Sequence, residues 1–285
     1  MFLRQTVRAR IANAVGALLV GMFGVVAAGT FSSIPVGAST KHSGNVDVYY
    51  AASLQQIMEG SIGPAFARAT GYTFRGFSGA SGTNANLIKS GAAVGDVFIS
   101  ANVATNLTLE GTTNGDWLRT FVVFGNSPLV LGYNPKSAFA TTIKTQPWFA
   151  AVTSPGIRVG RTDPVADPKG KLTSQAVAAG VQIYNDPALA AVTASPSNVY
   201  LERSLVGLLQ SGQLDAGFFY SSEARAAGIP FVKLGHLDLA ATFTIGELAR
   251  DAHQKAADAF MAFLLGKSGS KLLAREGVSV VRPRV

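Results

Sequence analysis

Two serine-containing turns are the part of the sequence best suited to bind a ligand. Ser53 lies in the run Ala-Ala-Ser-Leu, and Ser81 lies in the later run Ala-Ser-Gly-Thr-Asn-Ala. Each run follows an apolar segment typical of a strand and precedes a segment typical of a helix. Such turns offer backbone N–H groups and hydroxyls to an anion. The same serines would also serve as ordinary helix N-caps, so the turns alone leave both roles open.

The segment Arg161–Gly170 is the most unusual stretch of the chain. It contains two Asp-Pro pairs, which hold the backbone in an extended turn. The loop is either a rigid connection with solvated acids or one wall of a cleft. Tyr220 ends an apolar run, so its phenol either reaches that cleft or belongs to the core. Glu202 lies near the start of a predicted helix, where the helix dipole favours a carboxylate.

The sequence carries no recognisable catalytic constellation. His42, His236 and His253 are not arranged in a metal-binding spacing, and we interpret them as surface or incidental residues. There is no Gly-x-Ser-x-Gly motif and no P-loop. Because the chain has no cysteine, it has no thiolate nucleophile, disulfide or thiolate metal site. We therefore expect a protein that is not an enzyme and has no cofactor.

The elements that must position the two serine turns alternate between strand and helix. Small turn residues separate them, which is typical of a parallel, doubly wound α/β sheet. The predicted strands and helices, in chain order, are Val46–Ala51, Leu54–Thr70, Gly71–Phe77, Ala85–Ser90 and Asp96–Ser100.

A second α/β unit is expected after a long β-rich run over Leu118–Tyr133. We expect that run to break at Gly125–Pro128, and the chain to return to the first unit from Phe243, with a helix over Ala249–Leu265. The strands and helices predicted between them are Gly156–Gly160, Lys171–Tyr184, Val199–Ser211, Ala216–Tyr220, Ser221–Ala227 and Phe231–Leu234.

The N-terminus resembles an export signal. Residues Met1–Arg10 contain three arginines and no acid, and Ile11–Gly29 is almost wholly apolar. This pattern predicts a secretory signal peptide, with a retained membrane anchor as the alternative. The chain has 24 Lys and Arg against 16 Asp and Glu, a formal charge of +8. It shows no dense basic tract interleaved with aromatics, so we expect no nucleic-acid partner.

The order of these motifs resembles a known family. Ala-Ala-Ser-Leu, then Ser-Gly, then Gly-Asp-Val-Phe-Ile-Ser-Ala is similar to the molybdate- and tungstate-binding proteins of ABC importers. The Thr-Asp-Pro-x-x-Asp-Pro-x-Gly loop and the run from Leu208 to Ala224 are similar too, and the resemblance covers the chain from about Val46.

The resemblance implies a type II periplasmic binding fold. Two α/β lobes, joined by crossover strands, enclose a ligand cleft. The implied domains are 1–38 as signal peptide or N-terminal anchor, 45–126 with 236–285 as the first lobe, and 127–235 as the second.

The same resemblance implies a set of ligand-binding residues. Ser53 and Ser81 match the serines that bond the oxyanion, and Tyr220 matches the donor from the second lobe. In a branch resembling the archaeal tungstate binders, an Asp and a Glu also bind the metal centre, which becomes six-coordinate. Asp167 and Glu202 fall in those positions. Lys169 falls where some members have an alanine whose N–H contacts the ligand.

We expect an exported monomer, at the periplasmic or extracellular face of the cell membrane. It would capture molybdate or tungstate between neutral dipoles and deliver it to a membrane ABC permease. The alternatives are a sulfate- or thiosulfate-type oxyanion binder, or an enzyme or sensor domain on the same two-lobed scaffold. The residues do not distinguish molybdate from tungstate.

Overall fold

The computed structural model describes residues 42–281, all within one compact unit, Ser39–Val285. The predicted signal peptide or anchor, 1–38, lies outside the described residues. Among the residues that the structure describes, no helix combines the length and the apolar composition needed to cross a membrane.

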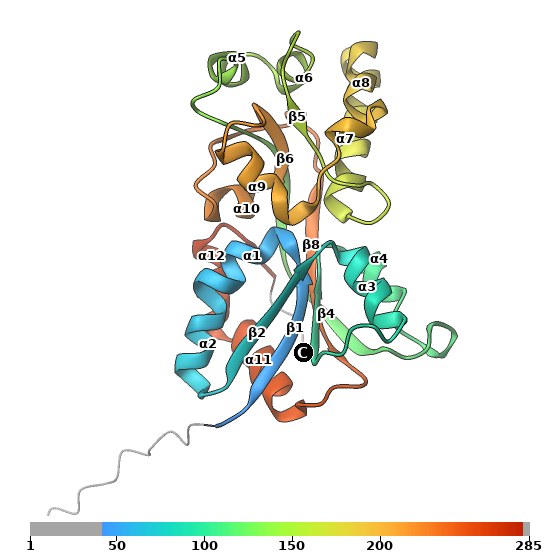
Figure 1. Ribbon diagram of the computed structural model, residues 1–285, viewed down its shortest axis with the longest axis vertical. Coiled ribbons are helices and arrows are strands. Elements are labelled where there is room, and N and C mark those ends of the chain that lie inside the picture. The colour runs from blue at the N-terminus through green and yellow to red at the C-terminus, as the bar shows by residue number, and fades with distance from the viewer. Residues whose placement is uncertain (1–41, 282–285) are drawn as a thin grey trace, which may run out of the picture. The chain divides into compact units, whose positions relative to one another are not determined.

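The described strands form one mixed sheet in the order β2-β1-β3-β8-β4-β6-β5, with β7 and β9 also paired to β4. In the view of Figure 1, β1 and β2 lie in the lower half of the molecule and β5 and β6 in the upper half. β1 pairs in parallel with β2 and β3, as the alternation predicted. The strands are β1 Asn45–Ala51, β2 Thr73–Gly79, β3 Val97–Ser100, β4 Leu118–Tyr133, β5 Val159–Gly160, β6 Ala216–Tyr220, β7 Phe231–Lys233, β8 Ala240–Leu248 and β9 Ser279–Val280.

The long strand β4 belongs to both halves of the sheet. Its first part pairs with β8 as far as Pro128, and from Leu129 it pairs with β6. The predicted break at Gly125–Pro128 is therefore wrong. A register shift between Val123 and Gly125 absorbs the irregularity, and Gly125 lies so close to Val278 that a Cβ would meet its side chain at 2.5 Å. The chain returns along β8, which the residue pattern had indicated only as a return from Phe243.

Helices cover both halves of the sheet. We call the elements around β1, β2, β3 and β8 the first lobe, and those around β5, β6 and β7 the second lobe. The longer helices are α2 Gly63–Thr70, α3 Ser81–Lys89, α7 Pro168–Tyr184, α9 Glu202–Gln210, α11 Gln254–Leu265 and α12 Lys267–Arg275. The shorter helices are α1 Gln55–Ile57, α4 Val103–Leu107, α5 Ala140–Thr145, α6 Trp148–Val152, α8 Ala190–Ala194 and α10 Ser221–Ala226.

Short 3-10 and π segments complete the helical structure. They are η1 Ala52–Leu54, η2 Met58–Ile62, η3 Thr112–Asn114, η4 Pro187–Leu189 and η5 Pro196–Asn198. The predicted helix over Leu54–Thr70 therefore contains a π turn, η2, and α3 begins at Ser81 rather than at Ala85. This earlier start places Ser81 in the first turn of α3 instead of in the preceding turn.

Candidate functional site

The five residues predicted to bind a ligand all lie at the N-terminal ends of helical segments. Ser53 is in η1, Ser81 and Glu202 are the first residues of α3 and α9, and Asp167 and Tyr220 are the N-caps of α7 and α10. The positive ends of α3, α7 and α9 favour negative charge at these positions. All five side chains are buried.

Two hydrogen bonds near these residues connect the first lobe with the second lobe. The Ser53 N–H of the first lobe donates to Glu202 Oε1 of the second lobe over 3.1 Å. The Gly82 N–H donates to the Ala166 carbonyl over 3.0 Å. Ser53 and Glu202 are therefore in direct contact, and Ser81 lies one residue from the contact that holds the Asp167 loop.

Four of the five predicted residues carry a buried oxygen that finds no hydrogen-bond partner in residues 42–281. These atoms are Ser53 Oγ, Asp167 Oδ2, Glu202 Oε2 and Tyr220 OH. Ser81 differs, because its Oγ accepts from the Ala101 N–H over 3.1 Å. Buried polar atoms are nearly always paired in folded proteins, and exceptions call for a ligand or another explanation. We call Ser53, Asp167, Glu202 and Tyr220 the cleft cluster.

The remaining oxygens of the two carboxylates are held in place by backbone groups. The Lys169 N–H donates to Asp167 Oδ1 over 2.9 Å, which caps α7, and the Ser53 N–H holds Glu202 Oε1. The loop before Asp167 turns tightly, since a Cβ on Gly170 would lie 2.4 Å from the Asp163 carbonyl oxygen. The backbone thus leaves each carboxylate with one free oxygen.

A buried lysine accompanies the cleft cluster. Lys169 Nζ donates to both oxygens of Glu223, over 2.8 and 2.9 Å, and lies 3.5 Å from Glu202 Oε1. Glu223 also accepts the Tyr220 N–H over 3.2 Å. An ammonium therefore lies within the same group of side chains as the predicted ligand-binding residues.

The charges in this group perturb one another. Burial raises the pKa of Glu202 to about 8, with a further contribution from the charge of Asp167. Burial likewise raises the pKa of Asp167, and the charge of Lys169 opposes this effect. Burial also raises the pKa of the Tyr220 phenol, followed by the charges of Asp167 and Glu202. A neutral phenol at Tyr220 can donate a hydrogen bond.

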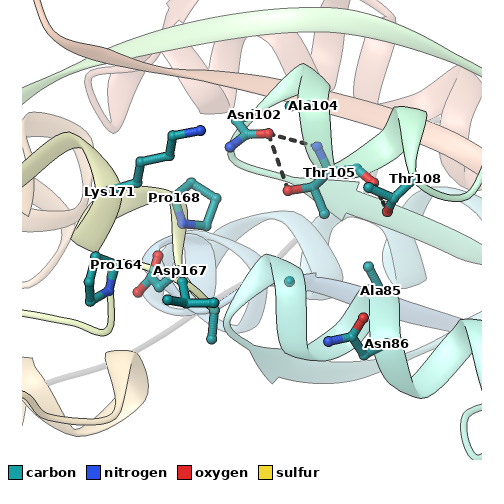
Figure 2. Close-up of a pocket in the computed structure, with 13 residues that line it drawn as sticks. Ala85, Asn86, Asn102, Ala104, Thr105, Thr108, Pro164, Asp167, Pro168 and Lys171 are labelled. Carbon is teal, nitrogen blue, oxygen red and sulfur yellow. Dashed lines mark hydrogen bonds between the residues drawn. The ribbon is translucent and has the colours of Figure 1, made fainter. Parts of the chain in front are cut away.

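Asp167 is one of the residues that line a cavity of about 320 Å³ (Figure 2). Helices α3 and α4 line it on the side of the first lobe, and Pro164–Pro168 with the start of α7 line it on the other side. Asn102 caps α4 by accepting from the Thr105 N–H over 2.8 Å. The cavity therefore lies between the lobes, with Asp167 at its wall.

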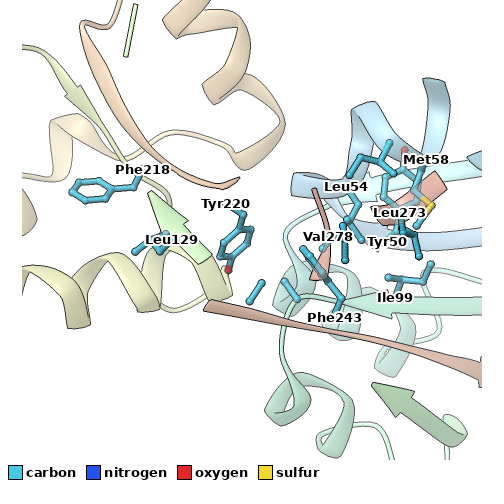
Figure 3. Close-up of a cluster of buried hydrophobic side chains, with 14 of the residues drawn as sticks. Tyr50, Leu54, Met58, Ile99, Leu129, Phe218, Tyr220, Phe243, Leu273 and Val278 are labelled. Atoms are coloured by element: carbon cyan, nitrogen blue, oxygen red, sulfur yellow. The ribbon is translucent and has the colours of Figure 1, made fainter. Parts of the chain in front are cut away.

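Tyr220 is also a core residue. Figure 3 shows its ring between Leu129 and Phe218 on one side and Phe243 on the other, and the Tyr220 and Phe243 rings meet edge to face at 6.0 Å. The structure confirms the core role. The hydroxyl has no hydrogen-bond partner in residues 42–281, and its role in a cleft stays a prediction.

The chain matches the family of bacterial extracellular solute-binding proteins over residues 46–279. It belongs to this family. The match covers both lobes and the whole cleft cluster.

Individual relatives agree with this assignment. A putative ABC transporter molybdenum-binding protein of Haloferax volcanii is 33% identical over 115 residues, which is 40% of this chain and 38% of the relative. The periplasmic molybdate-binding protein of Azotobacter vinelandii has a TM-score of 0.65 at 21% identity, covering 84% of this chain and 100% of that chain. The sulfate-binding protein SubI of Mycobacterium tuberculosis has a TM-score of 0.64 at 20% identity, covering 85% and 88%.

These similarities confirm the two-lobed type II fold and the resemblance to molybdate- and tungstate-binding proteins. The similar proteins are solute-binding proteins rather than enzymes, as predicted. The chain spans less than half the length of the first curated relatives that it matches. The domain boundaries 45–126, 127–235 and 236–285 stay a prediction.

Sequence reasoning missed the role of Glu223 and the burial of the Lys169 side chain. Glu223 follows the N-cap Tyr220 by three positions, which is the spacing of a capping box, so this signal was available. Lys169 gave no comparable signal, because its partner Glu223 is far away in the sequence and lysines are rarely buried.

Proposed function

We propose that this protein captures molybdate or tungstate in the cleft between its lobes and delivers it to a membrane ABC permease. The observation that carries the proposal is the cleft cluster, whose four buried oxygens have no hydrogen-bond partner in residues 42–281. An oxyanion offers acceptors for the Ser53 and Tyr220 hydroxyls, and its metal centre offers a site for the free oxygens of Asp167 and Glu202. Closure of the lobes around it would follow the hinge motion common in two-lobed binding proteins.

The two carboxylates favour molybdate and tungstate over sulfate. A carboxylate facing a dianion in a buried site is repelled, and the repulsion is stronger where water is excluded. Molybdenum and tungsten can relieve it by accepting carboxylate oxygens as additional ligands, whereas the sulfur of sulfate does not expand its coordination in this way. The free oxygens Asp167 Oδ2 and Glu202 Oε2 supply this pair of ligands.

The buried lysine disfavours a bare metal cation as the cargo. Asp167, Glu202 and Tyr220 are all oxygen ligands suited to a hard cation. However, Lys169 Nζ lies 3.5 Å from Glu202 Oε1 and its side chain is fully buried. A cation bound to Glu202 would therefore face a fixed positive charge at close range.

The predicted export of the chain supports this proposal. Solute-binding proteins of ABC importers act outside the cytoplasm, and the N-terminal segment of this chain has the pattern of a secretory signal. We infer that the protein works at the periplasmic or extracellular face of the membrane, as a monomer with one small anion per cleft and without a cofactor.

Thermal unfolding with four oxyanions tests the proposal. A ligand that binds only the folded protein raises the unfolding temperature by mass action. We expect large upward shifts with molybdate and tungstate, and almost none with sulfate or phosphate. Equal shifts with all four anions would contradict the proposed selectivity.

Calorimetric titration of Asp167→Ala and Glu202→Ala tests the carboxylate ligands. Each variant should bind molybdate much more weakly, because each loses an oxygen that faces the metal centre. Asp186→Ala is a matched control, since Asp186 caps η4 in the second lobe by accepting from Ala188. Unchanged affinity in both cleft variants would remove the two carboxylates from the site.

A further inference from the structure

We propose that Lys169 makes the cleft select anions by charge, so that a dianion is preferred to a monoanion of the same shape. This inference rests on the proposed oxyanion function and assigns a specificity-determining role to a residue outside the predicted ligand set. It starts from the position of the Lys169 ammonium, which is fully buried and pinned between two acidic side chains.

The lysine is held with little freedom. Two of its N–H groups are taken by Glu223, whose own position is fixed by the Tyr220 N–H at the start of α10. Its Nζ is also 3.5 Å from Glu202 Oε1. The ammonium also lies 5.8 Å from the centre of the Tyr220 ring. Of the two acids that hold Lys169, Glu202 therefore belongs to the cleft cluster, and Glu223 bonds the backbone of Tyr220.

The charge balance explains why a buried cation is needed there. Asp167, Glu202 and Glu223 would place three negative charges in one buried region, and Lys169 supplies the only opposing side-chain charge among their described neighbours. A dianion added to uncompensated carboxylates would be repelled. The lysine offsets Glu202 directly, so the carboxylates can face an anion.

Coulomb's law then distinguishes two guests of equal shape. The attraction of an anion to a fixed charge scales with the charge of the anion, so loss of the ammonium costs a dianion about twice as much as a monoanion. Tungstate and perrhenate are suitable probes, because both are tetrahedral oxyanions of similar size with charges of two and one. If the role of Lys169 were purely structural, its loss would weaken the binding of both anions equally.

The test is a calorimetric titration of tungstate and perrhenate into the wild type, Lys169→Met and the double variant K169M/E223Q. The double variant removes both charges of the Lys169–Glu223 pair, so neither charge is left buried without its partner. This variant therefore remains informative if Lys169→Met fails to fold. Lys144→Met is the matched control, since Lys144 is exposed in the last turn of α5 in the second lobe and its charge is screened by water.

We expect the wild type to prefer tungstate. In Lys169→Met the affinity for tungstate should fall on the order of 100-fold and that for perrhenate on the order of 10-fold, in the ratio that their charges dictate. Relative to the single variant Glu223→Gln, titrated alongside, the double variant should lose affinity for tungstate more than for perrhenate, because the two variants differ only in the ammonium. Lys144→Met should keep the wild-type ratio.

A tungstate-to-perrhenate ratio that is the same in the double variant as in Glu223→Gln, with tungstate still bound by the wild type, would overturn the role of Lys169 and leave the proposed function intact. A wild type that binds neither anion would overturn both.

Discussion

Two clusters of polar side chains in this protein each contain two carboxylates but differ in how the carboxylate oxygens are used. The cleft cluster lies between the lobes, and a second cluster of Asp47, Asp96 and His253 lies within the first lobe. In the cleft cluster each carboxylate keeps one oxygen without a partner in the described part of the chain. In the second cluster, which we call the Asp96 cluster, protein donors occupy the carboxylate of Asp96.

The Asp96 carboxylate joins three separate segments. One oxygen accepts the N–H groups of Ala252 and His253, and the other accepts the Asp47 N–H over 2.7 Å. The ring of His253 lies 3.0 Å from the same carboxylate. The sequence pattern indicates that His253 is a surface or incidental residue, whereas in the structure its ring contacts the Asp96 carboxylate. Ligand atoms of the three side chains lie close enough to hold a metal ion, but those of Asp96 are already engaged.

The difference separates a cluster that stabilises the fold from the one that we propose as the ligand site. A buried carboxylate whose oxygens are all bonded stabilises the segments that it connects. A buried carboxylate with a free oxygen costs stability until a partner arrives. Substitutions in the two clusters should therefore have opposite consequences for folding and for binding.

The largest effect is expected for Asp96→Ala. Removal of this side chain leaves the N–H groups of Asp47, Ala252 and His253 without their acceptor, and loss of such a charged network costs about 3 to 5 kcal/mol. Urea denaturation should show this fall in the free energy of unfolding. The variant that remains folded should bind molybdate as the wild type does; a selective loss of affinity would instead place Asp96 in a binding site.

Gly82→Ala should weaken binding without weakening the fold. A Cβ at Gly82 would meet the Ala166 carbonyl oxygen at 2.6 Å, across the contact between the lobes. Overpacking of this size costs about 1 to 3 kcal/mol. If the lobes must close against this clash in order to bind molybdate, the affinity should fall about 5- to 150-fold. Titration calorimetry measures the loss.

The control for this variant is Gly207→Ala on α9, where a Cβ would meet no atom within 4 Å. It should keep the wild-type affinity. Equal affinity in Gly82→Ala and the wild type would show that the contact between Gly82 and Ala166 is not needed for binding.

Tyr220→Phe should separate the two roles of this side chain. The ring keeps its place between the apolar side chains, whereas the buried hydroxyl that lacks a partner within residues 42–281 is removed. The unfolding free energy without ligand should stay the same or rise slightly. Molybdate should bind about 10-fold more weakly, the value of one hydrogen bond to a charged group. A clear loss of stability in the absence of ligand would mean that the hydroxyl has a structural partner.

The sequence predicted the parallel start of the sheet, and the resemblance named five candidate residues, which the structure places at the N-terminal ends of helical segments. Both rest on local patterns, such as the turn after β1 and the Asp-Pro pairs before α7. The continuity of β4 was missed, because its irregularity is absorbed by packing against Val278 and β8. The pair of Lys169 and Glu223 was missed for a similar reason, since only the folded chain brings α7 and α10 together.

The smallest effect is expected from titration of Glu202. Burial raises its pKa from the ordinary 4.5 to about 8, so between these values the folded protein holds the proton more tightly than the unfolded chain. The contribution of this group to stability is therefore greatest below pH 4.5 and is lost as the pH rises towards 8. Water entering an open cleft without ligand would reduce the effect to about 1 kcal/mol, or about 2 to 4 °C in Tm.

Glu202→Gln isolates this contribution, because its amide has nearly the same shape and does not titrate. The melting temperature of the wild type, measured relative to that of Glu202→Gln without ligand, should fall between pH 5 and pH 8. Asp163→Asn is the comparison variant, since Asp163 lies in the exposed part of the same loop that carries Asp167 and its carboxylate accepts only nearby N–H groups. A difference between wild type and Glu202→Gln that does not change with pH would mean that Glu202 stays ionised throughout, as it would if Lys169 outweighed burial. The cleft cluster would then resemble the Asp96 cluster, with its charge fully compensated before any ligand binds.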